Sequence, residues 1–314
     1  KLSKEDVFYI GRKHTFEGDR AVSFEYQEIT RLGIPFYQIS TARLQRKFTR
    51  YTLLSLTKLP VGLSQALLIL RKLKPDVVLG FGGYVSIPVI TAASLLKIPV
   101  VIHEQTLQAG FANKIISKFA KKICISWDSS RDFFPKEKII LTGNPVRAEI
   151  ISAKKDKKVK NQIPLIYITG GSAGSHAINN LVNETLPELL KDYSIVHQVG
   201  DSHKYKDFGL LNDKKNKLEI ILSKNYEIRK FLNSEESAII MNKADLVIGR
   251  SGINTVTELL YLNKPAFLIP LPVSQRNEQL RNAEFIQAFG LAEVIKQDLL
   301  TGNLFLSTIT GMIK

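Results

Sequence analysis

The chain has 314 residues, of which 44% are apolar and 23% are charged. This balance is typical of folded globular proteins, and the length suits two domains rather than one. There are 44 Lys and Arg against 29 Asp and Glu, and the formal charge of +15 favours an anionic partner without choosing among phosphates, lipid headgroups and nucleic acid. A single cysteine excludes a disulfide within the chain, and the most apolar stretch, residues 87–102, is too short and interrupted to span a bilayer.

In the first half of the chain, short apolar runs alternate with longer segments in which apolar residues recur at helical spacing. The predicted strands are residues 7–10, 35–39, 77–80, 100–103, 122–126 and 139–142. The predicted helices are residues 21–32, 61–73, 88–96 and 110–120. This alternation predicts parallel sheets covered by helices.

A basic stretch then interrupts the pattern. Residues 154–160 have no apolar period, so we predict a linker over residues 151–163 between domains 1–150 and 164–314. The predicted strands after it are residues 165–169, 194–199, 218–222, 246–249 and 266–270, and the predicted helices are 180–190, 254–262 and 277–289. Two such domains would leave a cleft, with ligands outside the carboxyl ends of the strands.

Two glycine clusters stand where a predicted strand is followed by a helix. They are GFGGYVS at residues 80–86 and GGSAGS at residues 170–175. Glycine lets backbone N–H groups approach a phosphate, and the helix behind it adds a partial positive charge. Neither cluster is a P-loop or fits the dinucleotide fingerprint well, and each alone is equally well explained as a tight turn. One in each half predicts two ligands that carry phosphate.

A third segment, residues 249–258, joins a predicted strand to a helix that we expect to begin near Asn254. Asn254 or Thr255 is predicted to cap this helix, and Thr255 and Glu258 have the spacing of a capping box. The alternative role of Glu258 is a carboxylate that accepts hydrogen bonds from sugar hydroxyls, as carboxylates do from ribose in dinucleotide-binding folds.

Six motifs together resemble the MurG family of glycosyltransferases. They are DVVLGFGGYVS (76–86), IPVVIHEQ (98–105), GNPVR (143–147), GGSAG (170–174), ADLVIGRSGINTVTE (244–258) and the segment 265–270, in the family's order. The resemblance covers essentially the whole chain. It implies an α/β protein of the GT-B class, with two Rossmann-like doubly wound domains. It also implies an inverting hexosyltransferase that moves N-acetylglucosamine from UDP-N-acetylglucosamine to undecaprenyl-pyrophosphoryl-N-acetylmuramyl-pentapeptide, converting lipid I to lipid II in peptidoglycan synthesis.

The resemblance also implies roles for individual residues. The donor-binding residues would be Thr106, Arg147, Ser172, Leu232, Ile253, Asn254, Thr255, Val256, Thr257, Glu258 and Gln279. Within this set Ser172 would bind the diphosphate, Glu258 the ribose and Gln279 the sugar, and Leu232 or its backbone would face the uracil. Gly82, Gly83 and Tyr84 would hold the acceptor's diphosphate. His103 and Glu104 are the candidates for the catalytic base, and no tightly bound metal or other cofactor is expected.

The chain departs from the family pattern in two places. It opens on a sequence like the family's second strand, so we expect the first strand and its glycine loop to be missing from this chain. The family's HEQN motif reads HEQT here, with Thr106 in place of the asparagine. His176 and His197 have no evident partner in the sequence, and we interpret both as structural.

Residues 41–59 interleave basic residues with leucines and aromatics, which is typical of an interfacial membrane anchor. The residues predicted to contact the anionic membrane surface are Arg46, Lys47, Phe48, Tyr51 and Leu54. The alternative is an ordinary amphipathic helix. We expect a peripheral protein on the cytoplasmic face of the bacterial plasma membrane, with no nucleic-acid partner, and the resemblance allows other cell-wall enzymes as partners.

Three alternatives remain at this point. One is a GT-B enzyme with another lipid acceptor, or a UDP-sugar epimerase. A second is a UDP-sugar-binding protein at the membrane surface whose catalysis is impaired by loss of the first glycine loop. The third, from charge alone, is a nucleic-acid-binding protein.

Overall fold

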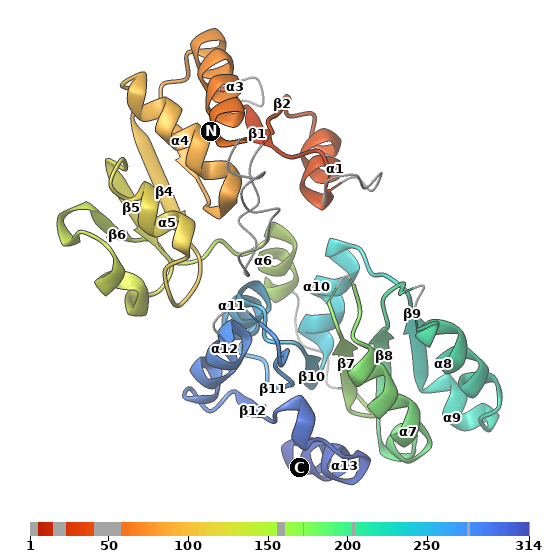
Figure 1. The fold of residues 1–314 in the computed structure, drawn as a ribbon. Helices are drawn as coiled ribbons and strands as arrows, with labels where there is room; N and C mark the ends of the chain where they lie inside the picture. Colours follow the sequence, from red (N-terminus) through yellow and green to blue (C-terminus); the bar gives the residue numbers. More distant parts are fainter. Residues whose placement is uncertain are drawn as a thin grey trace. The chain divides into compact units, whose positions relative to one another are not determined.

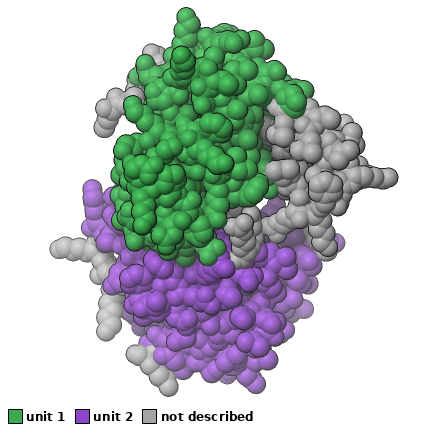
Figure 2. All heavy atoms as spheres, turned by 60° about the vertical axis from the view of Figure 1, so that its left-hand side comes forward, with its two compact units in different colours: residues 1–144 green, residues 145–314 purple. Residues whose placement is uncertain are grey.

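The structure, a computed structural model, describes residues 6–14, 23–40, 58–155, 161–171, 173–202, 205–274 and 277–313. The chain divides into two compact units, residues 1–144 and residues 145–314, which Figure 2 shows in separate colours. In each unit, parallel strands alternate along the chain with helices (Figure 1).

Unit 1 contains two parallel sheets, one of order β1-β2 and one of order β3-β4-β5-β6. Its strands are β1 (Tyr9–Gly11), β2 (Phe36–Gln38), β3 (Val78–Gly80), β4 (Val100–Glu104), β5 (Lys122–Ile125) and β6 (Ile139–Leu141). Its helices are α1 (Phe24–Arg31), α3 (Lys58–Leu73), α4 (Gly83–Leu95) and α5 (Phe111–Ile116), with the 3-10 turns η2 (Asp128–Phe133) and η3 (Lys136–Lys138). Ile90, Ile102 and Ile123 lie in one buried cluster, which packs α4 against β4 and β5.

Unit 2 contains one six-stranded parallel sheet of order β12-β11-β10-β7-β8-β9. Its strands are β7 (Leu165–Thr169), β8 (Ser194–Gln198), β9 (Tyr226–Arg229), β10 (Leu246–Gly249), β11 (Ala266–Leu268) and β12 (Ala292–Val294). Its helices are α6 (Ala148–Lys155), α7 (His176–Asp192), α8 (Asp207–Asn216), α9 (Ile220–Lys224), α10 (Ser234–Lys243), α11 (Ile253–Leu262), α12 (Glu278–Gln287) and α13 (Gly302–Ile313), with the 3-10 turn η5 (Gln297–Leu299).

The order of strands in unit 2 creates a switch point. From β7 the chain adds β8 and β9 on one side, then returns to place β10, β11 and β12 on the other side. At such a reversal the loops after the two central strands diverge and leave room for a ligand at the carboxyl edge of the sheet. In unit 2 these are the loops that follow β7 and β10.

Both faces of this sheet are covered by apolar clusters. Side chains alternate along β7, so that Ile166 and Ile168 pack in one cluster and Tyr167 in the other. The first cluster includes residues of α7 and α13, and the second includes residues of α6, α10, α11 and α12. A sheet covered on both faces requires nearly continuous apolar strands, which explains why these runs stand out in the sequence.

Two predictions about elements differ from the structure. The predicted strand 218–222 is wrong, because residues 220–224 form α9 and the strand lies later, at β9. Ile220 and Ile221 are 74% and 76% exposed, whereas Tyr226 on β9 is 1% exposed. Residues 151–155 of the predicted linker are helical and close α6, residues 156–160 lie outside the described residues, and the contacts divide the chain after Asn144.

Candidate functional site

The loop after β7 has the backbone of an anion-binding turn. Gly171 and Gly174 have φ angles of +82° and +75°, in the left-handed region that glycine adopts without strain. The Gly171 N–H donates to Thr169 Oγ1 at 3.0 Å, and the Gly174 N–H donates to the Gly171 carbonyl at 3.1 Å. Helix α7 then begins at His176, so its positive dipole end lies behind the loop. Ser172, the predicted diphosphate ligand, lies outside the described residues.

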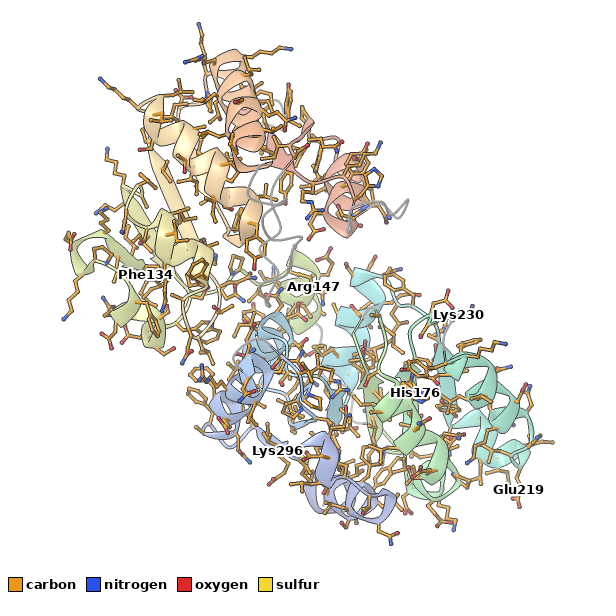
Figure 3. The ribbon with its side chains drawn as sticks, in the orientation of Figure 1. Phe134, Arg147, His176, Glu219, Lys230 and Lys296 are labelled. Carbon is orange, nitrogen blue, oxygen red and sulfur yellow. The ribbon has the colours of Figure 1, made fainter. Side chains whose placement is uncertain are left out.

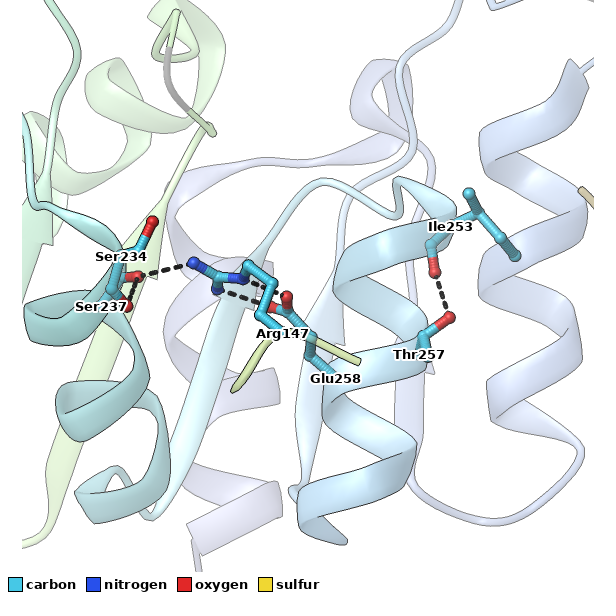
Figure 4. Close-up of polar contacts among 6 residues, drawn as sticks. All are labelled: Arg147, Ser234, Ser237, Ile253, Thr257 and Glu258. Carbon is cyan, nitrogen blue, oxygen red and sulfur yellow. Dashed lines mark hydrogen bonds and ion pairs between the residues drawn. The ribbon is translucent and has the colours of Figure 1, made fainter. Parts of the chain in front are cut away.

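Arg147 and Glu258 form a bidentate ion pair in unit 2 (Figure 4). Arg147 Nε lies 2.6 Å from Glu258 Oε1, and the NH2 nitrogen lies 3.0 Å from Oε2. Glu258 is buried on α11, whereas Arg147 is partly exposed just before α6 (Figure 3). The hydrogen bond to Glu258 is the main cause of a raised pKa at Arg147, so the guanidinium stays charged. The sequence analysis predicts that each residue binds the sugar-nucleotide donor separately, whereas the structure pairs the two side chains with each other.

The capping role predicted for Asn254 or Thr255 is wrong. Helix α11 begins at Ile253, and its N-cap is Gly252, whose extended backbone carries no capping side chain. Glu258 therefore lies in the second turn of the helix, too far along to complete a capping box. The carboxylate is held by Arg147 instead, which leaves the sugar-binding alternative in place as a prediction.

The other residues predicted on this helix divide by their exposure. Ile253 and Val256 are buried, and Val256 packs in the core. The Thr257 hydroxyl donates to the Ile253 carbonyl at 2.8 Å within the helix, while Asn254 is exposed and Thr255 is partly exposed. Of these five residues, only Asn254 and Thr255 therefore present side chains outward.

Leu232 and Gln279 also have partners within unit 2. The Leu232 side chain is buried in the core, so a contact with a nucleotide would have to come from its backbone. Gln279 Oε1 accepts the Leu271 N–H at 2.9 Å, and the Gln279 carbonyl accepts from Ser251 Oγ at 2.6 Å. Gln279 thereby ties α12 to the loops after β11 and β10.

Arg250, in the loop after β10, has a positioning role that the sequence did not reveal. Its guanidinium donates to the Ile269 and Pro270 carbonyls at 2.9 and 3.2 Å, to Ser175 Oγ at 2.8 Å and to Gln297 Oε1 at 2.7 Å. Desolvation by burial lowers its pKa. Arg250 thus connects the loop after β10 with the N-cap of α7 across the switch point. The signal in the sequence is an arginine directly after a predicted strand, in the segment GRSG at residues 249–252.

The two histidines without evident partners do have partners in the structure. His176 Nδ1 lies 2.7 Å from Asp207 Oδ1, and its ring stacks on Tyr205 at 3.9 Å between centroids. His176 stands at the start of α7 (Figure 3). His197, on β8, is fully buried, with hydrogen bonds at both ring nitrogens.

In unit 1, Glu104 organises the loop that follows β4. Its Oε1 accepts from the Thr106 N–H at 3.0 Å and from the Thr106 hydroxyl at 2.6 Å. Its Oε2 accepts from the Gly110 N–H at 2.8 Å and from Asn113 Nδ2 at 2.9 Å. Glu104 is 3% exposed, so its carboxylate oxygens accept hydrogen bonds from the protein rather than from solvent. The sequence did not point to Gly110 or Asn113 as its partners.

His103 and the first glycine cluster lie at the same edge of the unit 1 sheet. His103 Nε2 is 3.2 Å from Ser126 Oγ and 3.3 Å from the Gly143 carbonyl. Gly82 and Gly83 have φ angles of +84° and +75°, and Gly82 is the N-cap of α4, whose first turn has no acidic residue. Tyr84, in that turn, is partly exposed. A backbone of this shape suits an anion.

The five residues predicted to contact the membrane, Arg46, Lys47, Phe48, Tyr51 and Leu54, lie outside the described residues. Within the described ranges, no helix has the length and apolar character needed to cross a membrane. In that same part of the chain, no group of three or more His, Cys, Asp or Glu side chains is arranged to hold a metal ion.

Comparison with known proteins places the chain in a family. The glycosyltransferase family 28 N-terminal domain matches residues 20–125, and the family's C-terminal domain matches residues 165–314. A UDP-N-acetylglucosamine–N-acetylmuramyl-(pentapeptide) pyrophosphoryl-undecaprenol N-acetylglucosamine transferase of Clostridium perfringens is 36% identical over 98% of this chain and 82% of its own length.

Solved structures agree on the fold. The crystal structure of Acinetobacter baumannii MurG is 28% identical, with a TM-score of 0.65 over 98% of this chain and 90% of that one. A UDP-GlcNAc 2-epimerase from Neisseria meningitidis, at 16% identity, shares the fold with a TM-score of 0.64 over 98% of this chain and 90% of its own. The chain therefore belongs to glycosyltransferase family 28 and, within it, to the MurG family of N-acetylglucosamine transferases, with the GT-B fold.

Proposed function

We propose that the chain transfers N-acetylglucosamine from UDP-N-acetylglucosamine to undecaprenyl-pyrophosphoryl-N-acetylmuramyl-pentapeptide, the lipid I to lipid II step of peptidoglycan synthesis. The names of relatives such as the Clostridium perfringens enzyme support this reaction. The structural observation that carries it is the switch point of unit 2. There the glycine loop follows β7, and the loop leading to α11 and its Arg147-paired Glu258 follows β10.

In this proposal, unit 2 binds the donor. The backbone amides of the glycine loop and the Ser172 hydroxyl bind the diphosphate, which the dipole of α7 also favours. Glu258 accepts hydrogen bonds from the ribose. A carboxylate oxygen has a second lone pair, so Glu258 can accept from ribose while it remains bonded to Arg147. The exposed Asn254 and the partly exposed Thr255, on the same helix as Glu258, bind the donor beside it.

Unit 1 binds the acceptor through Gly82, Gly83 and Tyr84, at the start of α4. The acceptor hydroxyl oxygen forms a bond to the anomeric carbon, the bond from that carbon to the diphosphate oxygen breaks, and UDP leaves with the electron pair. A base must take the hydroxyl proton. Because Glu104 already accepts four hydrogen bonds, we assign the proton to His103 rather than to Glu104.

We also propose that the leaving diphosphate needs no tightly bound metal. Developing negative charge is stabilised by backbone amides, the helix dipole and Arg147, groups that are already oriented before the reaction. Dialysis of the enzyme against EDTA checks this point, because transfer should persist in metal-free buffer.

The membrane assignment is likewise a proposal. We place the protein on the cytoplasmic face of the plasma membrane as a peripheral protein that binds anionic lipid through Arg46, Lys47, Phe48, Tyr51 and Leu54. The basic and aromatic sequence of this segment supports the assignment.

The test of the reaction is transfer of labelled N-acetylglucosamine to a lipid-linked muramyl-pentapeptide. The unaltered chain should form the disaccharide product, and Glu258→Gln should raise KM for UDP-N-acetylglucosamine by roughly 10- to 100-fold, since it removes a charged acceptor. Glu284→Gln, an exposed substitution on α12, is the matched control and should change neither KM nor kcat. Binding of the sugar nucleotide without transfer to this acceptor would contradict the proposal and favour another acceptor or an impaired enzyme.

A further inference from the structure

Two buried polar side chains on neighbouring strands of unit 2 form a hydrogen-bonded chain that ends at the glycine loop. Tyr167 on β7 is 2% exposed, and Gln198 on β8 is 5% exposed. Thr169 pairs in register with Gln198, so Tyr167, Thr169 and Gln198 face the same side of the sheet. The Tyr167 hydroxyl lies 3.1 Å from Gln198 Oε1, and Gln198 Nε2 lies 3.2 Å from the Gly171 carbonyl oxygen.

The direction of this chain follows from its last member. A backbone carbonyl can only accept, so Gln198 must direct its NH2 group at Gly171. Its Oε1 then accepts from the Tyr167 O–H. Burial raises the pKa of Tyr167 to about 12, so the hydroxyl keeps its proton at neutral pH and remains a donor. The charge of Arg147 lowers the pKa of Tyr167, and the charge of Glu258 raises it. The hydrogen-bonded chain of Tyr167 and Gln198 therefore lies close enough to the ion pair to interact with it electrostatically.

Gln198 holds a residue whose orientation decides the shape of the loop. Gly171 has a positive φ, and its N–H is bonded to Thr169 on its own strand. Its carbonyl accepts from Gly174 within the loop and from Gln198, which reaches it from the neighbouring strand. A carbonyl oxygen turned toward a diphosphate would repel it. The bond to Gln198 keeps the negative end of this dipole directed at the sheet.

We propose that Gln198 is a positioning residue for the donor diphosphate, which holds the Gly171 carbonyl through its amide while Tyr167 orients that amide. This inference rests on the proposed function, because it takes the diphosphate of the sugar nucleotide as the ligand of the glycine loop. Gln198 touches the loop backbone and acts on the ligand only through it.

The experiment compares the affinities of UDP and uridine for the full chain by calorimetry. Gln198→Met keeps the length of the side chain and removes its donor. Loss of one hydrogen bond that shapes the diphosphate site should lower UDP affinity by about tenfold. Uridine has no diphosphate, so its affinity should not change. In transfer assays the same variant should raise KM for UDP-N-acetylglucosamine more than it lowers kcat.

Two further variants should lower UDP affinity by different amounts. Gln198→Glu faces the Gly171 carbonyl with a second acceptor, and its loss of UDP affinity should equal or exceed that of Gln198→Met. Tyr167→Phe keeps the bond from Gln198 to Gly171 and removes only the orienting donor, so UDP affinity should fall by about threefold.

Ile195→Val is the matched control, because Ile195 lies on the same strand and packs in the core of the opposite face. It should leave the ratio of UDP to uridine affinity unchanged. An equal loss of UDP and uridine affinity in Gln198→Met would show a general structural role and overturn the inference, as would an unchanged UDP affinity. An unaltered chain that binds neither ligand would overturn the proposed function instead, before any variant is compared.

Discussion

At the scale of single residues, the protonation of His197 follows from its neighbours. Asn179 Nδ2 donates to Asp207 Oδ2 at 2.7 Å and to the Val199 carbonyl at 3.1 Å, which turns Asn179 Oδ1 toward His197 Nε2 at 3.1 Å. That oxygen can only accept, so Nε2 carries the proton and Nδ1 accepts from the Tyr226 hydroxyl at 2.9 Å. The partners suit a neutral ring, and burial lowers the pKa of His197 to about 3.

This lowered pKa makes unit 2 less stable in acid. Between the folded pKa of about 3 and the ordinary value near 6.5, the unfolded chain binds a proton at this position that the folded chain does not. The contribution is therefore complete above the unfolded pKa and is lost as the pH falls. From pH 7 to pH 5 the free energy of unfolding should drop by about 2 kcal/mol on account of His197.

Hydrogen exchange of the β8 amides measures this change. His197→Gln lacks the titrating group and serves as the reference, because all other carboxylates and histidines titrate in both proteins. The contribution of His197 is the difference between the two proteins in the slope of the free energy of unfolding against pH. The same pH dependence in both would refute the assignment of a neutral buried ring.

At the scale of elements, two loops of unit 2 cross so closely that only glycine fits. A Cβ on Gly174 would lie 2.0 Å from the Val199 carbonyl oxygen, and a Cβ on Gly200 would lie 2.5 Å from the Gly174 backbone. Both residues have positive φ angles. The contact joins the loop after β7 to the loop after β8, and it explains why the glycine cluster has its third glycine at this position.

Gly174→Ala should therefore destabilise unit 2 by more than about 3 kcal/mol and remove UDP binding, since the clash is with backbone that cannot move aside. Thermal melting followed by circular dichroism gives the comparison. Gly209→Ala is the control, because Gly209 lies inside α8 and a Cβ there would meet no atom within 4 Å. That substitution should raise stability by about 0.5–1 kcal/mol. A tolerated Gly174→Ala would mean that the two loops are not held in contact.

Two elements of unit 2, β9 and α10, differ from what the sequence pattern predicts. Residues 218–222 are more apolar than residues 226–229, yet the strand is the second segment, because β9 pairs with β8 and alternates buried Tyr226 with exposed neighbours. An edge strand of this kind needs few apolar residues. Helix α10 was not predicted although its capping box, Asn233 with Glu236, is present in the sequence.

At the scale of the whole molecule, the net charge of +15 favours an anionic partner, and the basic and aromatic segment 41–59 makes an anionic membrane the expected one. Vesicles that contain anionic lipid should bind the chain, and the binding should weaken as salt is raised. The double variant Arg46→Glu and Lys47→Glu should lower vesicle affinity by at least about tenfold, at about 1 kcal/mol for each basic residue removed. Cosedimentation with vesicles of matched size measures the affinity.

A second double variant separates a local patch from the total charge. Lys217→Glu with Lys224→Glu changes the net charge by the same amount at exposed positions of unit 2. It should have a clearly smaller effect on vesicle binding, while UDP affinity stays the same in both variants. Equal losses from the two pairs would assign membrane binding to the overall charge rather than to residues 41–59.

The sequence by itself determined the family, the two α/β halves and most of the strands, among them β7 and β10 with the bounds that the structure shows. These features are local. A buried parallel strand must be apolar over consecutive residues, and a turn that approaches a phosphate needs glycine at fixed offsets. Both requirements leave a mark within a few residues of sequence.

Only the tertiary structure decided which side chains act together. Arg147 and Glu258 are 111 residues apart, and residues 145–150, expected in the first domain, belong to unit 2 with Glu258. Glu104 accepts a hydrogen bond from Gly110 in the loop after β4, and Gln198 donates one to the Gly171 carbonyl. No spacing in the sequence predicts either contact. Hydrogen bonds and ion pairs depend on distances of about 3 Å between atoms, and these distances exist only once the strand order of the sheet has brought distant segments together.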